Sequence, residues 1–404
     1  MAKSNETAVA TKAAGNSKPE KPYEGFPLFP HATKRWAKKI RGKLCYFGSW
    51  ADGWQKALDQ YQEQRDDLHA GRAPRANRDG LTVAMLVDKF LNTKRHLVDT
   101  RELTARSWAD YYSTCQRVVE AFGKNRLVED LRAEDFEKLR AKFAKTRSPV
   151  TLGNEIQRVR VLMKYAFDSS LIDTPIRYGQ TFKRPSKATI RRERQAKGLR
   201  MFEAAELRKI IDAAGVPLKA MLLLAANCGF GNRDVGSLPI TALDLEAGWV
   251  TFPRPKTAIQ RRCWLWPETV ETIRAALAER PEPKDKAHAG LVFLTRCGAP
   301  WAKLMEMADD PTEQATFVDC PVAKETRKLL DTLGLHQHGR GFYAIRHGFE
   351  TIGGASRDQV AVDHIMGHAD ASMAATYRER VDDDRLKAVA EHVRNWLFAE
   401  AVTG

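Results

Sequence analysis

The stretch from Tyr343 to Tyr377 carries side chains suited to chemistry at a phosphate. Arg346 follows an apolar approach, a Gly367-His368 step comes later, and Tyr377 lies nine residues beyond that histidine. An arginine keeps its charge and offers a planar fork to two oxygens, while a histidine can donate a hydrogen bond to another. A phenol has a pKa of about 10, so Tyr377 needs nearby cations before it can act as a nucleophile. A helical tyrosine considered alone is usually a packing residue, and the spacing from His368 favours the nucleophile.

Two cations earlier in the chain could complete such a site. Arg233 stands at the opening of a predicted helix, and Lys256 stands at or near the turn of a predicted β-hairpin. The arginine could hold a second edge of the phosphate, and a lysine on a turn can donate a proton to a leaving oxygen. Alternatively, Arg233 forms a salt bridge with Asp234 and the hairpin lysine is solvated. The other hairpin cations that could take the place of the lysine are Arg254, Arg261 and Arg262.

These groups suit a strand transfer that needs no energy source. A nucleophile attacks phosphorus, cations neutralise the nonbridging oxygens, an acid protonates the leaving oxygen, and a covalent intermediate conserves the bond energy. We therefore expect neither a cofactor nor a metal ion. A metal-dependent nuclease would need clustered carboxylates for two ions, and the acidic run 382–384 is better explained as a helix cap.

The segment from Tyr343 to Tyr377 resembles the C-terminal signature of the tyrosine recombinases, the phage integrase family. That pattern is His-x-x-Arg, then Leu-Gly-His, then Tyr nine residues later, and Tyr343 stands in place of the first histidine. The stretch C-G-F-G-N-R-D-V-G-S-L resembles the family's T-G-x-R-x-x-E-x-x-x-L step. It has two extra residues before Arg233, and Gly236 stands three residues beyond it, where the acidic residue is usual. Asp234 could orient Arg233 instead.

The resemblance implies a site-specific DNA recombinase, an integrase of a phage or another mobile element, that cuts and rejoins DNA through a 3′-phosphotyrosine. The implied partners are double-stranded DNA attachment or recombination sites, further copies of the chain in a homotetramer, and accessory DNA-bending proteins. By position, the resemblance assigns the phosphate clamp to Arg233 and Arg346 and the general acid to Lys256. It assigns the histidine that binds a phosphate oxygen to His368 and the nucleophile to Tyr377. Tyr343 joins this catalytic set, although it is a poor base near neutral pH. We interpret the nearby His336, His338, His347 and His364 as structural.

The charge of the chain indicates a polyanionic partner. The 404 residues carry a formal net charge of +15, spread over several segments rather than along one amphipathic helix. This distribution favours nucleic acid over a membrane surface. No apolar run is long enough to span a bilayer. The six cysteines form no CxxC pair and no zinc spacing, which indicates reduced packing residues in a cytosolic protein. The resemblance implies that this is the bacterial cytosol, with the protein associated with the nucleoid.

The hydrophobic periodicity predicts a mainly α chain with small β elements, an α+β class. A small sheet-plus-helix domain, similar to the arm-binding domains of some integrases, precedes a four-helix core-binding bundle and a mostly helical catalytic domain with a small sheet. The predicted ranges are a disordered leader at 1–22, the arm domain at 23–75, the bundle at 81–182, a basic linker at 183–200 and the catalytic domain at 201–404. A polar loop is predicted at 303–320, and the amphipathic tail could pack at home or on a neighbouring subunit.

In the predicted arm domain, aromatic and β-forming residues alternate with basic ones. With the strand period of two, the basic face comprises Arg35, Lys39 and Arg41, and the opposite face comprises Trp36 and Ile40. We predict short antiparallel strands whose basic face lies in a DNA groove. The alternative is a solvated basic hairpin without a specific partner.

The segment 183–200 is dense in Lys and Arg and poor in apolar side chains. It could be a flexible, solvated linker, or a strap that crosses the DNA backbone through Arg191 and Arg192 and becomes ordered there. In the bundle, the cations that could face phosphates, each of them individually better explained as a solvated charge, are Lys142, Lys145, Arg158, Arg160 and Lys164.

Two other functions remain compatible with the residues. A type IB topoisomerase shares this chemistry but acts as a monomer and needs little site preference. A DNA-binding regulator without catalytic activity would explain the departures at Tyr343 and Gly236.

Overall fold

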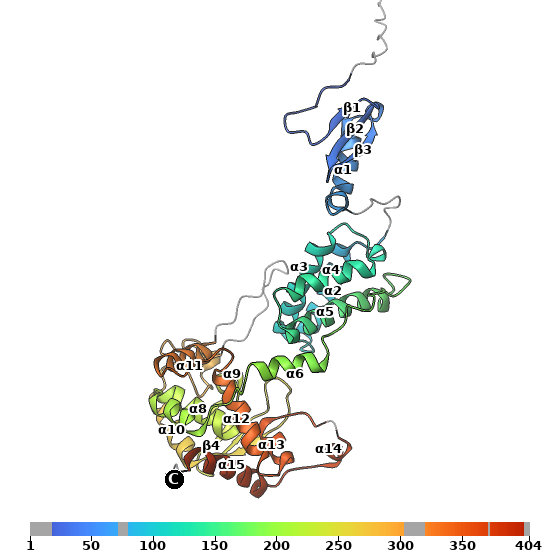
Figure 1. The fold of residues 1–404 in the computed structure, drawn as a ribbon. Helices are drawn as coiled ribbons and strands as arrows, with labels where there is room; N and C mark the ends of the chain where they lie inside the picture. Colours follow the sequence, from blue (N-terminus) through green and yellow to red (C-terminus); the bar gives the residue numbers. More distant parts are fainter. Residues whose placement is uncertain (1–17, 72–79, 303–319, 371, 400–404) are drawn as a thin grey trace, which may run out of the picture. The chain divides into compact units, whose positions relative to one another are not determined.

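The computed structural model describes residues 18–71, 80–302, 320–370 and 372–399 (Figure 1). The chain divides into two compact units, Met1–Glu193 and Arg194–Gly404. Both are mainly helical and each contains a three-stranded sheet, which confirms the predicted mainly α class with small β elements. Most of the predicted leader, residues 72–79 and nearly all of the loop predicted at 303–320 lie outside the described residues. In the described ranges, no helix combines the length and the apolar character needed to cross a membrane.

The N-terminal sheet has three antiparallel strands that pair in sequence order, with a helix packed against them. Its elements are β1 (Phe29–His31), β2 (Arg35–Ile40), β3 (Lys43–Ser49) and α1 (Trp54–His69). Trp36 and Ile40 are buried with Phe47 in one core, whereas Arg35 and Lys39 are exposed. The alternation of the sequence therefore gives the correct inner and outer residues of β2 for these four positions.

Arg41 departs from the predicted strand face because it lies in the β2–β3 turn. Arg41 and Gly42 both have positive φ, 48° and 81°, as in the two-residue turns whose twist matches that of the flanking strands. The guanidinium of Arg41 donates to the carbonyl of His69 at 3.2 Å, so it ties this turn to the end of α1.

The predicted four-helix bundle is present in the same unit. Its helices are α2 (Val83–Asp99), α3 (Ala105–Phe122), α4 (Ala133–Ala144) and α5 (Pro149–Asp168). Thr82 accepts a hydrogen bond from the amide of Met85 at 3.2 Å, and Ser148 caps α5 immediately before Pro149. The apolar stripes meet in one core that includes Phe90, Phe122, Phe136, Ile156 and Val159.

Most of the bundle cations considered for DNA phosphates have partners inside the bundle. The pairs are Lys142 with Glu120 (3.6 Å), Arg158 with Asp110 (2.6 Å), Arg160 with the carbonyl of Phe182 (3.2 Å) and Lys164 with Asp168 (2.5 Å). Lys145 is exposed. Arg158 therefore links α5 to α3, and Arg160 ties α5 to the segment that follows it, two roles that the sequence did not reveal.

The basic segment predicted as a linker contains a helix, α6 (Lys187–Ala196). The hydroxyl of Ser186 accepts a hydrogen bond from the amide of Thr189 at 3.1 Å, as an N-cap does. No residue of α6 is buried, and Arg191 and Arg192 are both exposed. The segment is solvated as predicted, but it is helical rather than irregular.

The C-terminal unit is built around α8 (Val216–Cys228), in which ten of thirteen residues are buried. Its apolar run has no polar face, so other helices must cover it on several sides. The other helices of the unit are α7 (Ala204–Ala213), α9 (Asn232–Gly236), α10 (Pro267–Ala278), α11 (Pro321–Thr332), α12 (Phe342–Gly354), α13 (Gln359–Met366), α14 (Met373–Tyr377) and α15 (Asp383–Phe398). Helices α10 and α12 pack directly on α8.

The small sheet of this unit contains the predicted hairpin. Its strands are β4 (Leu243–Asp244), β5 (Trp249–Thr251) and β6 (Arg262–Trp264), antiparallel in sequence order. Helix α15 packs on its own unit, against α12 and β6, and the indole nitrogen of Trp266 donates to the carbonyl of Ala390 at 2.9 Å. The predicted apolar stripe of the C-terminal helix is thus buried within its own unit.

Candidate active site

Arg346 is the buried cation around which the site is built. It lies on α12 with only 3% of its surface exposed. Its guanidinium donates to the carbonyl of Gly229, just past the end of α8, and to the carbonyl of Met366, the last residue of α13, at 2.8 Å. Helix C-termini present unpaired carbonyls and the negative end of the helix dipole, so both favour a cation. Burial is the main cause that lowers the pKa of Arg346, and the nearby Arg254 lowers it further; a guanidinium nevertheless stays charged.

His368 is placed beside Arg346 by the turn that ends α13. Gly367 has a φ of 64°, and the amide of His368 donates to the carbonyl of Asp363 at 2.9 Å. A left-handed glycine closes a helix in this way with little strain. A Cβ on Gly367 would also lie 3.0 Å from the Cβ of Arg254. The close approach of the hairpin is therefore a second reason, besides the positive φ, for glycine at this position.

The imidazole of His368 lies between a cation and two carboxylates. Its Nε2 is 3.1 Å from Nη2 of Arg346, and its Nδ1 is 3.2 Å from Asp363 and 3.5 Å from Glu350. Because a guanidinium can only donate, Nε2 must accept, and the ring proton belongs on Nδ1, where Asp363 accepts it. Neither carboxylate was singled out from the sequence, although Asp363 lies only five residues before the histidine.

Glu350, Asp363 and His368 also form the kind of cluster that could hold a metal ion, with ligand atoms within 4.8 Å of one another. The Arg346 guanidinium contacts the same imidazole. A divalent cation would be repelled by that guanidinium, so we interpret the carboxylates as holding the histidine ring.

The β5–β6 hairpin brings two further arginines to this turn. Arg254 donates to the carbonyl of Gly367 at 3.1 Å. Arg261 is only 2% exposed, and its guanidinium carbon lies 4.2 Å from the centre of the Phe230 ring. It donates to the carbonyl of Phe252 at 2.8 Å and to Asp234 at 2.9 Å, while its Nη1 is buried without a hydrogen-bond partner among the described residues.

Arg233 makes no hydrogen bond with Arg346 or His368 in the described structure. It is exposed on α9, and its guanidinium has no hydrogen bond or ion pair with any residue that the structure describes. Asp234, expected either to orient Arg233 or to form a salt bridge with it, is buried instead. It accepts from the amide of Gly231 at 2.6 Å and binds Arg261. The predicted Asp234–Arg233 pairing is therefore wrong.

Lys256 and Tyr343 are both exposed to solvent. Lys256 is exposed in the hairpin turn, as predicted, and its ammonium has no partner in the described part of the chain. Tyr343 is 48% exposed and its ring meets the edge of His347, with 5.5 Å between ring centres.

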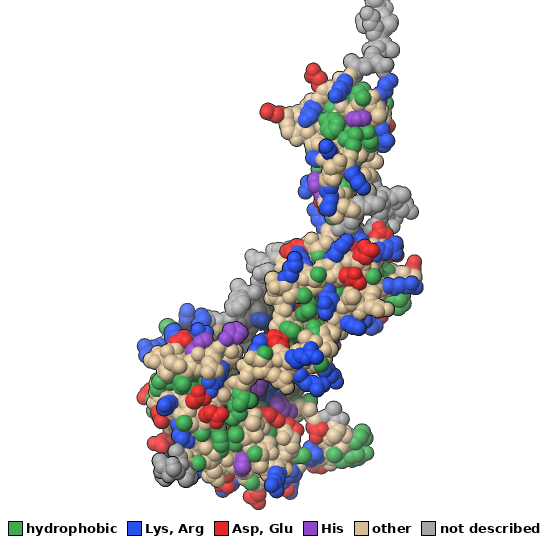
Figure 2. Space-filling view, in the orientation of Figure 1, with side chains coloured by type: hydrophobic (Ala, Val, Ile, Leu, Met, Phe, Trp, Pro, Cys, Tyr) green, Lys and Arg blue, Asp and Glu red, His purple; other side chains and the backbone are tan. Residues whose placement is uncertain are grey.

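Tyr377 is exposed to solvent. It ends the single turn of α14, which begins after Ser372. Figure 1 shows α14 at the end of a loop that projects from α13, and Figure 2 shows hydrophobic side chains on that projection. The side chain of Tyr377 is 78% exposed, and it has no hydrogen bond with the described residues. This exposure excludes a packing role for Tyr377 within the unit.

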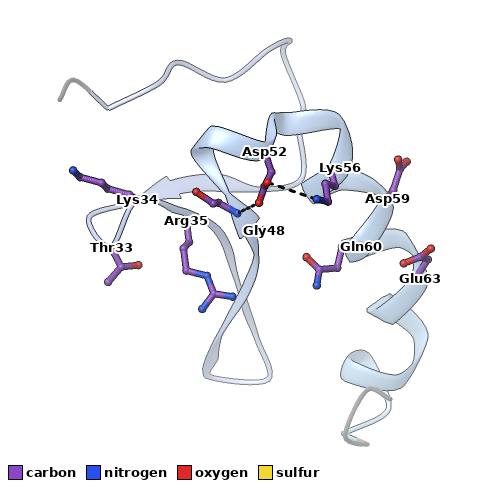
Figure 3. Close-up of a pocket in the computed structure, with 10 residues that line it drawn as sticks. Thr33, Lys34, Arg35, Gly48, Asp52, Lys56, Asp59, Gln60 and Glu63 are labelled. Atoms are coloured by element: carbon purple, nitrogen blue, oxygen red, sulfur yellow. Dashed lines mark hydrogen bonds and ion pairs between the residues drawn. The ribbon is translucent and has the colours of Figure 1, made fainter. Parts of the chain in front are cut away.

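A second polar surface lies on the N-terminal sheet, in an open groove between the strands and α1 (Figure 3). Lys34 and Arg35 line one side, and Asp59 and Glu63 line the other. The strand side of this groove is therefore basic, whereas the α1 side carries Asp59 and Glu63 together with Lys56.

Comparisons with known proteins agree with the fold. Residues 197–383 match the model of the phage integrase family. A λ integrase dimer bound to a COC′ core site has 14% sequence identity and a TM-score of 0.54, over 90% of this chain and 98% of that one. No curated protein sequence matches this chain significantly.

Two further solved structures have a similar sequence identity and TM-score to this chain. A λ integrase tetramer bound to a Holliday junction has 14% identity and a TM-score of 0.55, over 89% of this chain and 98% of that one. A fragment of the Tn1549 transposon integrase with a circular intermediate DNA has 14% identity and a TM-score of 0.53, over 78% of this chain and all of that one, 100%. At such low identity these similarities establish the fold.

Proposed function

Because residues 197–383 form a phage integrase family domain, we propose that this chain is a site-specific DNA recombinase that cuts and rejoins DNA through a 3′-phosphotyrosine. The observation that carries the proposal is the contact of the buried Arg346 with His368, in the same unit as an exposed phenol, Tyr377. A buried, fixed cation is suited to charge that develops in a transition state, because it needs no reorganisation.

In the proposed cleavage step, the phenol oxygen of Tyr377 attacks the scissile phosphorus, and the phenol proton passes to the surrounding water. A bond forms between that oxygen and phosphorus, and the bond from phosphorus to the 5′ oxygen breaks. Lys256 protonates the leaving oxygen, and Arg346 holds the nonbridging oxygens. For His368 to join it, Nε2 must take up a proton and exchange its contact with Arg346 for one with a phosphate oxygen. The freed 5′ hydroxyl of a partner strand then attacks the phosphotyrosine, which reverses the same bond changes and releases Tyr377.

The proposed partners follow from this chemistry. Exchange between two duplexes needs several active sites, and λ integrase has been observed as a tetramer bound to a Holliday junction. We propose a homotetramer on double-stranded attachment sites, with accessory DNA-bending proteins, in the bacterial cytosol where such DNA lies. No cofactor is required, since the covalent intermediate conserves the phosphodiester energy.

The test is the fate of Tyr377 on suicide DNA. A random-sequence library of nicked duplexes, in which the cleaved end diffuses away, should yield detergent-resistant protein–DNA adducts with the wild-type chain. Tyr377→Phe removes the nucleophile, so adducts should fall below detection, by about 10⁴-fold or more. Sequencing of the trapped DNA would give the preferred site.

The matched control is Tyr23→Phe, at another exposed tyrosine, which should form adducts like the wild type. Adducts that persist in Tyr377→Phe would show that the nucleophile is elsewhere. Relaxation of plasmids of arbitrary sequence by a monomer would point to a type IB topoisomerase, and tight binding without any adduct to a regulator.

A further inference from the structure

We propose that Arg261, on the hairpin, provides the second phosphate-binding guanidinium of the site, and that the exposed Arg233 does not. This inference rests on the proposed function, because it concerns the phosphate held by Arg346 and His368. It changes which residue completes the phosphate clamp: Arg261, from the same hairpin as Lys256, rather than Arg233 of α9.

The first support is position. A Cβ added to Gly367 would meet the Cδ of Arg261 at 3.4 Å, and Gly367 is bonded directly to His368. Arg346 donates to the carbonyl of Met366, on the other side of the same glycine. Arg261 and Arg346 therefore reach one turn from two different elements.

The second support is an unused donor. Arg261 uses Nε on the Phe252 carbonyl and Nη2 on Asp234, while its Nη1 is buried without a partner among the described residues. A buried donor that gives up water without a replacement is costly, and a phosphate oxygen would satisfy it. Arg254 is the weaker candidate, since its Nη1 already donates to Gly367.

The third support is the balance of charge. Arg261 and Arg346 are both nearly fully buried, and the buried acid close to them is Asp234. Burial lowers the pKa of both arginines, and the charge of a neighbouring arginine, Arg254, lowers each further. A pocket with excess buried positive charge is one that an anion stabilises.

The sequence motif also has a gapless alignment. If C-G-F-G-N-R-D-V-G-S-L is placed on T-G-x-R-x-x-E-x-x-x-L without an insertion, Asp234 takes the acidic position and Leu238 the leucine. The arginine position then falls on Gly231, where an added Cβ would lie 3.2 Å from the Tyr343 ring. The acid at that position is present in this chain, and the arginine that binds it is Arg261.

A purely structural role for Arg261 is the competing explanation, because a buried ion pair with Asp234 could simply fix the hairpin. The experiment must therefore separate phosphate binding from folding. The test variant is Arg261→Met combined with Asp234→Asn, which leaves no lone buried charge and keeps an oxygen for the Gly231 amide. The matched control is Arg233→Met. The single variant Asp234→Asn shows how much of any loss in the test variant comes from the substitution of Asp234.

Single-turnover adduct formation is measured on the trapped site, once with the natural phosphate and once with a neutral methylphosphonate at the cut position. On the natural phosphate, we expect the test variant to lose about 10²–10³-fold and Arg233→Met to stay within about threefold of wild type. On methylphosphonate, the gap between the test variant and wild type should shrink to about tenfold or less, because the charge that Arg261 neutralises is gone. Arg261→Lys should recover part of the activity on the natural phosphate.

An equal loss on both substrates would show a structural role and overturn the inference, as would a loss in Arg233→Met with full activity in the test variant. If the wild type forms no adduct on any DNA, the proposed function fails. In that case, equilibrium DNA binding tests whether Arg261 contacts a phosphate. The slope of log K against log salt should fall by about 1 in the test variant. An unchanged slope would show that Arg261 makes no phosphate contact.

Discussion

Position 343 is where a single residue changes the expected proton chemistry. Tyr343 stands on α12 one turn before Arg346, in the place where the family pattern has a histidine. Its ring fits because Gly231 has no side chain, since a Cβ there would lie only 3.2 Å away. A phenol is a poor base near neutral pH. In the proposed mechanism, the proton of Tyr377 therefore lacks a good acceptor at this position.

We expect Tyr343→His to raise the rate of adduct formation at pH 7 by about tenfold or more. The new imidazole would lie on α12 near His347, whose pKa is lowered by burial and then by the charges of Arg200 and Arg346. It should likewise titrate below about 6.5 and be neutral, able to accept a proton, at pH 7. The rate should therefore rise as the pH increases toward about 6.5 and then level off.

The measurement for this variant is a pH profile of single-turnover adduct formation, with Tyr343→Phe as the control. The control should behave like the wild type, because both lack a base at this position. A histidine variant that follows the wild-type profile at every pH would mean that the proton leaves by another route.

Residues of the site could be predicted where they lie in one linear stretch. Arg346, His368 and Tyr377 have fixed spacings, and the structure puts the first two in contact. Arg261 was named only as one of several hairpin cations, and its proposed place beside Arg346 could not be predicted, because it reaches Gly367 only when the hairpin folds back on α13. The signal that was available is the spacing of Asp234 from Gly229, which matches the motif without an insertion.

Helices with an apolar stripe were predictable, and helices without one were not. The stripes of α3, α5 and α15 are mostly buried, as their 3.6-residue spacing requires, but Phe167, predicted to belong to the stripe of α5, is 41% exposed. Helix α6 has no buried residue, and α14 is a single turn, so neither carries the periodicity from which a helix is predicted. These are also the elements with exposed residues assigned to DNA, Arg191, Arg192 and Tyr377.

Helix α12 contains a glycine whose replacement tests how its core is packed. Gly348 is buried beside Phe202, Ile345 and Trp396, and a Cβ added to it meets no atom within 4 Å. Glycine inside a helix costs about 0.5–1 kcal/mol relative to alanine. We therefore expect Gly348→Ala to raise the free energy of unfolding by about 1 kcal/mol, and the midpoint of thermal unfolding of the C-terminal unit by about 2–4 °C.

The control is Gly353→Ala in the same helix, where a Cβ would meet a methyl carbon of Val362 at 3.3 Å. That close contact should cancel part of the gain in helix propensity, so the control should be less stable than Gly348→Ala. Thermal unfolding followed by circular dichroism compares the three proteins. A midpoint for Gly348→Ala below that of the wild type would mean that the space beside Gly348 is not available to a methyl group.

For the whole molecule, the net charge of +15 does not give the number of phosphates that the chain binds. Several cations are used internally, such as Arg158 on Asp110 and Arg394 on Glu268. Figure 2 shows Lys and Arg side chains spread among acidic ones on both units. Exposed cations without such partners contribute most to DNA binding, because a phosphate does not compete there with a carboxylate.

Arg35 and Lys39 are such cations on the N-terminal sheet, exposed and without an ion-pair partner in the part of the chain that the structure describes. Each phosphate contact contributes about 0.9 to the slope of log K against log salt. We expect Arg35→Gln with Lys39→Gln to lower that slope by about 2, measured by fluorescence anisotropy on a labelled duplex. Adduct formation at saturating DNA should not change, because neither residue belongs to the Arg346–His368 site.

The control for this prediction is Lys56→Gln in the same groove, since Lys56 already lies 3.6 Å from Asp52. Removing a paired cation should change the slope by less than about 0.5. If the double variant and Lys56→Gln gave the same small change, the basic face of β2 would be a solvated surface, and DNA binding would depend on α6 and the C-terminal unit.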